Sequence, residues 1–198
     1  MAPASSILRL AWTVPCLLLI STLPIVQAQN SAPNPGCGKA RVSIAADSFL
    51  ILNNALIAVE LPSGWVRDES KSNPFFFLLA GDRYESARTL MYVRVQELGS
   101  SFEQAVKNDE RDFRQSNPSV QILDDPQLEI LEKGCPTKTQ RFVYRSKQKT
   151  YVDQVTKIGI NGLLLNVVLS SDSEAEIARY EKDYEFLLRH LGLVMHAQ

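Results

Sequence analysis

Residues 151–169, YVDQVTKIGINGLLLNVVL, decide the fold that this sequence favours. Two apolar-rich runs, 151–160 and 163–169, flank the dipeptide Asn161-Gly162. A two-residue type I′ turn needs positive φ at both central positions, and asparagine and glycine tolerate this best. The stretch therefore predicts a β-hairpin with strands at 151–160 and 163–169.

An amphipathic helix is expected directly after this hairpin. Residues 171–174, Ser-Asp-Ser-Glu, have the spacing of a capping box, in which a serine hydroxyl accepts a hydrogen bond from a first-turn amide. Apolar side chains then recur at three- and four-residue steps, and the helix is expected to end near Gly192. The apolar positions are Ile177, Tyr180, Tyr184, Leu187, Leu188 and Leu191.

The sequence before the hairpin alternates short apolar runs with turn residues, which is typical of further strands. A second capping box at 100–103 opens an amphipathic helix that Asn117-Pro118 ends. Strands are expected at 55–61, 75–79, 90–95, 120–123, 128–131 and 141–145, and 75–79 should pair with 90–95 in the antiparallel sense.

A sharp corner is expected at residues 59–65, VELPSGW. Pro62 removes a donor from the strand ladder, and Gly64 permits a tight turn. The turn should deliver Trp65 toward the core.

Together with the hairpin-rich middle and the final helix after residues 169–171, this corner resembles the Mog1/PsbP-like superfamily over residues 48–192. That superfamily includes the PsbP proteins of photosystem II and diverse bacterial envelope proteins. The resemblance implies an α+β fold, an antiparallel β-sheet flanked by amphipathic helices in an α/β/α sandwich. It also implies accessory, assembly or binding roles without a shared catalytic site. The positions that carry over are structural: Leu61, Pro62, Gly64 and Trp65.

The first 28 residues are typical of a cleaved signal peptide. Arg9 precedes a largely apolar run at 10–26, and the small residues at Val26 and Ala28 suit signal peptidase. A retained membrane anchor is less favoured because the run is short and interrupted by prolines. A lipoprotein anchor at Cys16 is disfavoured because Pro15 stands where a small residue is needed.

Composition then favours one ordinary domain. The chain has 198 residues, of which 45% are hydrophobic and 22% charged, as in globular proteins. We expect a flexible lead at 29–40 and a single domain at 41–198. Beyond residue 28 the formal charge is −2, so the concentrated basic surface that nucleic acid requires is not expected.

Cleavage would leave two cysteines, Cys37 and Cys135, in an exported chain. Such a pair favours one disulfide, and the alternative is two unpaired thiols. The absence of a Cys-x-x-Cys motif disfavours a redox pair.

The first candidate surface is basic. Arg141, Arg145, Lys147 and Lys149 share strand parity, so they could present one face to an anionic partner or lipid headgroup. The alternative is a solvated edge hairpin, because lysines commonly protect strand edges.

The second candidate surface is apolar. Residues 75–79, FFFLL, lack polar alternation, so either both faces of the strand are covered or Phe75, Phe76 and Phe77 form an exposed patch. Burial between helices is the favoured reading.

Signals of catalysis and metal binding are weak. The two histidines, His190 and His196, lie near the C-terminus, where His190 suits the last turn of a helix. Asp124-Asp125 before a proline indicates a solvated turn, and Ser63 has no nucleophile-elbow context. We expect no metal, no cofactor and no enzymatic activity.

The sequence thus predicts a secreted or periplasmic, non-enzymatic binding or assembly accessory module of the cell envelope with a protein partner. One alternative is a carrier of a small hydrophobic or anionic ligand, with its site at 75–79 or 141–149. A less favoured alternative is an enzyme of unrecognised type. Neither nucleic-acid binding nor stable membrane insertion after cleavage is expected.

Overall fold

The computed structural model describes Cys37 and residues 48–52, 55–70, 74–130, 133–146 and 148–196. The chain divides into two units, Met1–Asn30 and Ser31–Gln198, and all described residues belong to the second. The expected signal peptide at 1–28 and most of the expected lead at 29–40 lie outside the described residues. No helix in the described part of the chain has the length and apolar character needed to cross a membrane.

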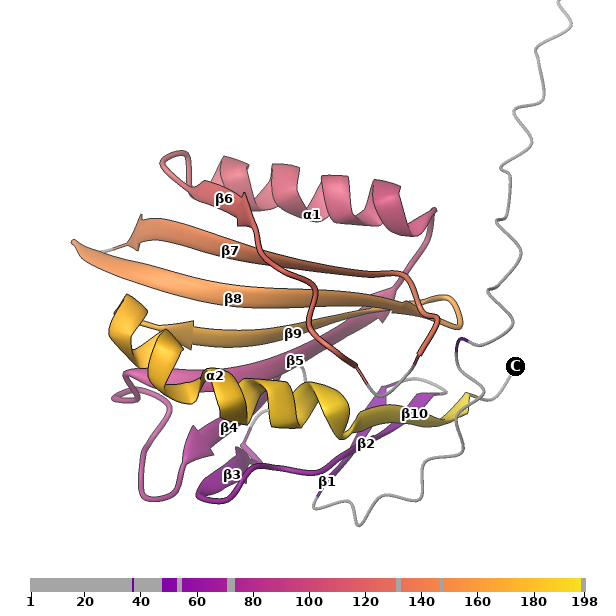
Figure 1. Ribbon diagram of the computed structural model, residues 1–198, viewed down its shortest axis with the longest axis horizontal. Helices are drawn as coiled ribbons and strands as arrows, with labels where there is room; N and C mark the ends of the chain where they lie inside the picture. The colour runs from indigo at the N-terminus through magenta and orange to yellow at the C-terminus, as the bar shows by residue number, and fades with distance from the viewer. Residues whose placement is uncertain are drawn as a thin grey trace, which may run out of the picture. The chain divides into compact units, whose positions relative to one another are not determined.

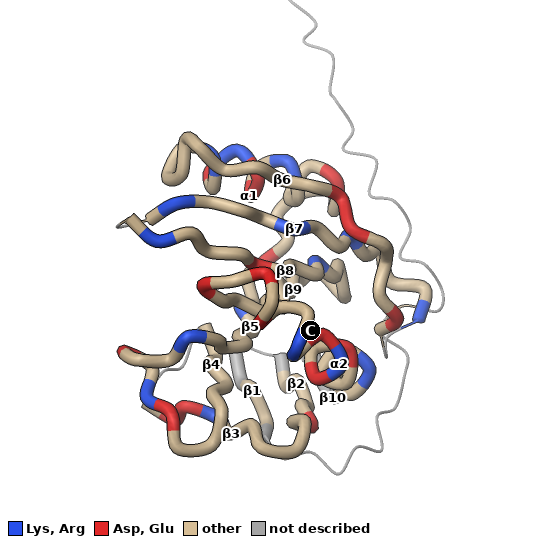
Figure 2. The backbone as a smooth tube through the Cα atoms, turned by 60° about the vertical axis from the view of Figure 1, so that its left-hand side comes forward, with Lys and Arg blue, Asp and Glu red and all other residues tan. Residues whose placement is uncertain are grey.

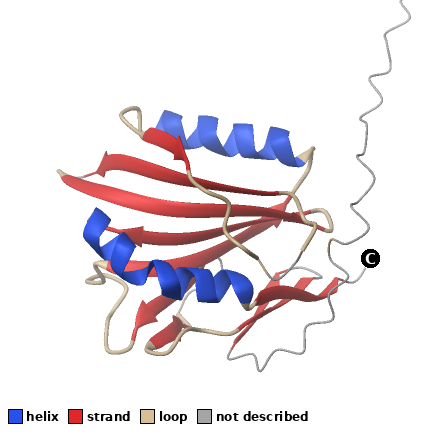
Figure 3. Ribbon diagram, viewed as in Figure 1, coloured by secondary structure: helices blue, strands red, loops and turns tan. Residues whose placement is uncertain are grey.

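The larger sheet has seven strands in the order β3-β4-β5-β9-β8-β7-β6, and every neighbouring pair is antiparallel (Figures 1 and 3). At its centre, the β8–β9 hairpin turns at Asn161 and Gly162, whose φ angles are 46° and 76°. The hairpin predicted from the sequence is therefore confirmed. The strands are β3 (Trp65–Asp68), β4 (Phe75–Leu79), β5 (Thr89–Glu97), β6 (Gln121–Asp124), β7 (Thr137–Ser146), β8 (Lys149–Ile160) and β9 (Leu163–Ser171).

A second, three-stranded sheet has the order β1-β2-β10. It contains β1 (Ser48–Leu52), β2 (Ala55–Val59) and β10 (Leu191–His196), again all antiparallel. The last helix, expected to end near Gly192, ends at Arg189, and Gly192 pairs with Ala58 as part of β10. Leu191 fits both the helical period and the strand, and its partner Val59 lies far earlier in the chain.

The two helices begin slightly later than their capping boxes suggest. In α1 (Phe102–Ser116) the cap is Ser101, whose hydroxyl accepts from the Gln104 amide at 3.2 Å. In α2 (Glu174–Arg189) the cap is Ser173, which accepts from the Glu176 amide at 3.2 Å. Ser100 and Ser171, the first residues of the predicted boxes, are thus not the caps.

The helices cover opposite faces of the larger sheet. Phe113 of α1 contacts the rings of Phe142 and Tyr144 on β7, a face that includes Val168 of β9. Tyr184 of α2 packs with the main core on the other face, where its hydroxyl donates to the carbonyl of Val167 at 2.7 Å. The α/β/α sandwich expected from the sequence is therefore confirmed.

One expected strand is absent. Residues 128–130 form no strand, and the segment between β6 and β7 instead crosses the α2 face of the sheet (Figure 1). There Ile130 joins the main core, which explains the apolar pattern without strand pairing. Pro126 lacks an amide hydrogen, so it cannot donate to a strand ladder at the point where β6 ends.

A disulfide joins Cys37 to Cys135, as the sequence predicts, with the two Cα atoms 4.6 Å apart. Cys135 belongs to the buried core, and Cys37 packs against that core. The bridge thus attaches the segment before β1 to the turn that leads into β7.

Candidate functional site

The basic residues predicted on the β7–β8 hairpin do not act as one free cluster. The Nε atom of Arg141 lies 3.2 Å from an oxygen of Asp125, and its Nη1 lies 3.3 Å from Glu174. Arg145 and Lys149 are exposed near the hairpin end, where Figure 2 shows basic segments of both strands. Lys147 lies outside the described residues. The hairpin as a docking surface stays a prediction.

The three phenylalanines of β4 divide between the two faces of the sheet. Phe75 and Phe77 are buried in the main core. Phe76 is half-buried on the other face, and its ring centroid lies 4.7 Å from that of Tyr84 and 5.5 Å from that of Tyr92. The three side chains therefore do not form one exposed apolar patch.

A polar pocket lies between the C-terminal half of α1 and the sheet, and none of the candidate site residues predicted from the sequence lines it. Its volume is about 320 Å³. The sheet contributes residues from β5, β7, β8 and β9, and the helix contributes its last turns. The lining residues are Tyr92, Arg94, Asp109, Asp112, Phe113, Ser116, Asn117, Phe142, Asp153, Val155, Asn166 and Val168.

Two cations share one carboxylate at one end of this pocket. Lys157 is 0% exposed, and its Nζ lies 2.9 Å from Oδ2 of Asp109. Arg94 binds Oδ1 of the same carboxylate through Nη2. Lys157 also donates to Oε1 of Gln140 at 3.2 Å and lies 5.0 Å from the centroid of the Phe142 ring. These contacts compensate Lys157 for burial, since a buried charge is tolerated only when paired and hydrogen-bonded.

A second carboxylate, that of Asp153 on β8, also lines the pocket and has no cationic partner among the described residues. Asp153 is 3% exposed, and its Oδ2 accepts a hydrogen bond from the Tyr144 hydroxyl at 3.2 Å. Burial raises the pKa of Asp153 to about 6, although the Ser170 and Tyr144 hydroxyls oppose this by stabilising the ionised form. Oδ1 has no hydrogen-bond partner of ordinary geometry among the described residues.

Asn166 is the most unusual residue of the pocket. Its side chain is 3% exposed, and neither Oδ1 nor Nδ2 has a hydrogen-bond partner among the described residues. In the strand register it lies between Arg94 on β5 and Lys157 on β8. Buried polar groups are almost always paired, and each unpaired one costs about 1–3 kcal/mol. A ligand or solvent group in the pocket would supply the missing partners.

The effect of Asp153 on stability can be tested with Asp153→Asn. The carboxyl has a pKa of 3.8 in its unperturbed form and about 6 in the folded protein, so the folded state holds this proton more tightly. The stability penalty of ionisation is therefore absent below pH 4, grows as pH rises to 6, and is complete above that. Asp153→Asn should raise the free energy of unfolding at pH 7.5 by up to about 3 kcal/mol, with little gain at pH 4, as measured by urea denaturation.

Asp172→Asn is the matched control for this prediction. Asp172 forms an ion pair with Arg88 at 3.0 Å, and a hydrogen bond from that guanidinium lowers the pKa of Asp172. Its substitution should therefore not stabilise the protein at neutral pH. An unchanged pH dependence in Asp153→Asn would show that Asp153 is not the destabilising group.

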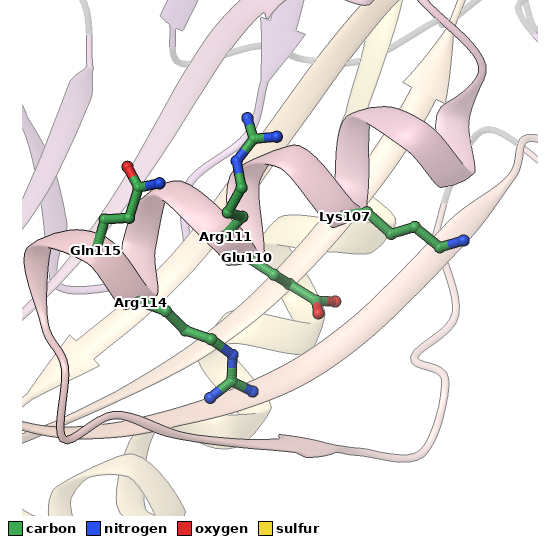
Figure 4. Close-up of a pocket in the computed structure, with 5 residues that line it drawn as sticks. All are labelled: Lys107, Glu110, Arg111, Arg114 and Gln115. Atoms are coloured by element: carbon green, nitrogen blue, oxygen red, sulfur yellow. The ribbon is translucent and has the colours of Figure 1, made fainter.

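A second hollow, more open to solvent, lies along α1 and is shown in Figure 4. Its volume is about 410 Å³. Glu110 is already engaged by Lys138 at 3.2 Å, and Arg114 donates to the carbonyl of Val120 at 3.3 Å. None of its lining residues contributes a buried unpaired polar atom, so it offers weaker support for a ligand site. The lining residues are Lys107, Glu110, Arg111, Arg114 and Gln115.

No group of three or more histidine, cysteine, aspartate or glutamate side chains is placed to hold a metal ion among the residues that the structure describes. His190 directly follows α2, and its Nδ1 lies 2.8 Å from the carbonyl oxygen of Phe186. Its ring also stacks on that of Phe186, with the centroids 4.0 Å apart. The histidine thus occupies the helix-end position that the sequence indicates.

Comparisons with known proteins identify the fold. No protein-family model and no curated protein matches the chain. The crystal structure of LpqN, a Mycobacterium tuberculosis protein, has a TM-score of 0.52 and 11% identity over 70% of this chain and 83% of LpqN. The Synechocystis PsbP protein CyanoP has a TM-score of 0.48 and 14% identity, over 69% of this chain and 86% of CyanoP. Saccharomyces cerevisiae Mog1p has a TM-score of 0.47 and 12% identity, over 70% of this chain and 90% of Mog1p. The likeness to LpqN is one of fold alone, and this chain has the α/β/α sandwich architecture that its sequence predicts.

Proposed function

We propose that this chain is an exported, non-enzymatic binding module of the cell envelope and that its ligand occupies the polar pocket between α1 and the sheet. The observation that carries the proposal is Asn166, a buried amide that lines the pocket with both polar atoms unpaired among the described residues. A bound molecule would restore those hydrogen bonds.

The size of the pocket favours a small ligand. About 320 Å³ is at the lower end of the range for small-molecule sites. Apolar walls from Phe113 and Phe142 would exclude water around the few polar groups that fix a ligand's orientation. The pocket therefore favours a carrier or sensor of a small polar molecule. It is a better candidate for the ligand site than the apolar residues of β4.

Export and an envelope role have separate support. Disulfides persist in oxidising compartments outside the cytosol, and the bridge between Cys37 and Cys135 fits such a compartment. LpqN, whose fold is similar, is involved in cell envelope biogenesis. An accessory role with an envelope protein as partner is part of the proposal, with the exposed Arg145 and Lys149 as a surface for that partner.

Native mass spectrometry of the protein purified gently from its own cells tests the pocket. The wild-type protein should carry an added small-molecule mass, and Asn166→Leu should lose it. Leucine has nearly the shape of asparagine and removes the unpaired amide, so the variant should also gain about 1–2 kcal/mol of unfolding free energy.

Thr156→Val is the matched control, because Thr156 is equally buried on β8 and its hydroxyl pairs with Thr139 on the α2 face. This variant should keep the added mass. A protein that is bare in every preparation, or a ligand that Asn166→Leu retains in full, contradicts the proposal.

A further inference from the structure

The two ends of the pocket beneath α1 differ in charge. At one end, the lining cation Arg94 and the buried Lys157, which is not itself a lining residue, share the carboxylate of Asp109. At the other end, the carboxylate of Asp153 contacts hydroxyl groups and has no cation paired with it among the described residues. The first end therefore offers cationic donors, and the second offers an anionic acceptor.

The strand register gives the separation of these ends. Asp153 pairs with Ser170, Val155 with Val168, and Lys157 with Asn166. The Asp153 and Asn166 positions are thus four residues apart along the hairpin, about 13 Å between backbones at the usual strand rise. The apolar pair between them, Val155 and Val168, forms the floor of the pocket.

The unpaired atoms at the two ends differ in the same way as the charges. Near Asp153 the free atom is an acceptor, Oδ1. Near Asn166 there are two free donors, Nε of Arg94 and Nδ2 of Asn166, together with the acceptor Oδ1 of Asn166. A complementary ligand would donate hydrogen bonds at the first end and accept them at the second.

Other charged groups of the lining do not change this polarity. Asp112 of α1 also lines the pocket, but its side chain is 64% exposed and forms an ion pair with Arg111 at 3.1 Å. It therefore lies at the solvent side.

Building on the function proposed above, we infer that the ligand is a small zwitterion with an apolar middle. Its ammonium group binds Asp153, and its carboxylate binds Arg94 and Asn166. The chain between the two charges lies over Val155 and Val168. Neither a simple fatty acid nor a simple amine would satisfy both ends.

Isothermal titration calorimetry with three matched probes tests this inference: 6-aminohexanoate, hexanoate and hexylamine. We expect the dissociation constant of 6-aminohexanoate to be at least tenfold lower than that of either singly charged probe. One additional hydrogen bond to a charged group is enough to give a tenfold difference in affinity. Hexanoate or hexylamine binding as tightly as the zwitterion would overturn the inference.

Variants assign the two ends separately. Asp153→Asn should remove the advantage of 6-aminohexanoate over hexanoate, and Asn166→Leu should weaken both carboxylate probes while leaving hexylamine unchanged. The control Asp172→Asn, which lies outside the pocket, should bind all three as the wild type does. An Asp153→Asn protein that keeps the full preference for the zwitterion would contradict the assignment.

The calorimetry and the native mass spectra distinguish the two levels of failure. If the purified protein carries a ligand that Asn166→Leu loses, yet prefers no zwitterion, the inference about ligand class fails and the proposed function stands. If neither a cellular ligand nor any probe binds, both fail.

Discussion

Replacing Cys37 and Cys135 together with alanine is expected to lower the free energy of unfolding by about 4–5 kcal/mol, the value that chain entropy gives for a loop of this length. The two cysteines are 98 residues apart, so the bridge restricts more than half of the unfolded domain. Cys135 is also buried in the core, and its truncation removes packing. Urea denaturation of the oxidised protein and the variant measures the difference.

Single variants provide the control for this prediction. Cys37→Ala alone breaks the same bridge, and Cys37 is only partly buried against the core, so this variant should show most of the loss. Reduction of the wild-type protein should reproduce it. A loss below about 1 kcal/mol in both the single variant and the reduced protein would show that the bridge does not stabilise the fold in this way.

The sequence predicts those parts of the fold that depend on local chemistry. Asn161-Gly162 determines the turn of the central hairpin. Proline at 118 and the serine caps place the end of α1 and the start of both helices to within two residues. The resemblance of the corner at residues 59–65 supplies the α/β/α architecture, and the cysteine pair predicts the bridge. In each case the residues that carry the signal in the sequence are the same residues that make up the turn, cap, corner or bridge.

The parts that could not be predicted depend on distant partners. Strand β10 continues the apolar pattern of α2, and only its pairing with β2 shows that Leu191 belongs to a sheet. The strand expected at 128–131 shows the opposite case. Its apolar pattern includes Ile130, which enters the core from a loop and not from a strand. Periodicity alone does not distinguish these cases.

The candidate site was missed although it left a signal in the sequence. Asp153, Lys157 and Asn166 interrupt the otherwise apolar strands of the central hairpin, and a polar residue in a buried strand is a common mark of function. The convergence of Lys157 and Asn166 with Arg94 and Asp109 depends on the strand order β5-β9-β8, which is not the order of the sequence, and on the packing of α1 over the sheet. A search for polar interruptions in buried strands would have found the first three residues and not the last two.

Trp65→Ala is expected to lower the free energy of unfolding by about 3–5 kcal/mol, the usual cost of truncating a buried aromatic residue. Trp65 begins β3 directly after Gly64, whose φ of +86° makes the turn, and its amide donates to the carbonyl of Pro62 at 3.1 Å. The indole is buried edge-on against Tyr180 of α2. Its Nε1 donates to Asp183 at 2.9 Å, so one side chain joins the corner to the helix.

Two further substitutions separate packing from the hydrogen bond. Trp65→Phe keeps much of the packing and loses the donor, so it should cost about 1–2 kcal/mol more than the reduction in ring size alone. Asp183→Asn keeps an acceptor oxygen for the indole N–H, and only the negative charge of the acceptor is lost. This variant should change the free energy of unfolding by less than about 1 kcal/mol. If Trp65→Phe is as destabilising as Trp65→Ala, the indole–carboxylate bond dominates the corner, and if Trp65→Ala costs under about 1 kcal/mol, the corner does not couple β3 to α2.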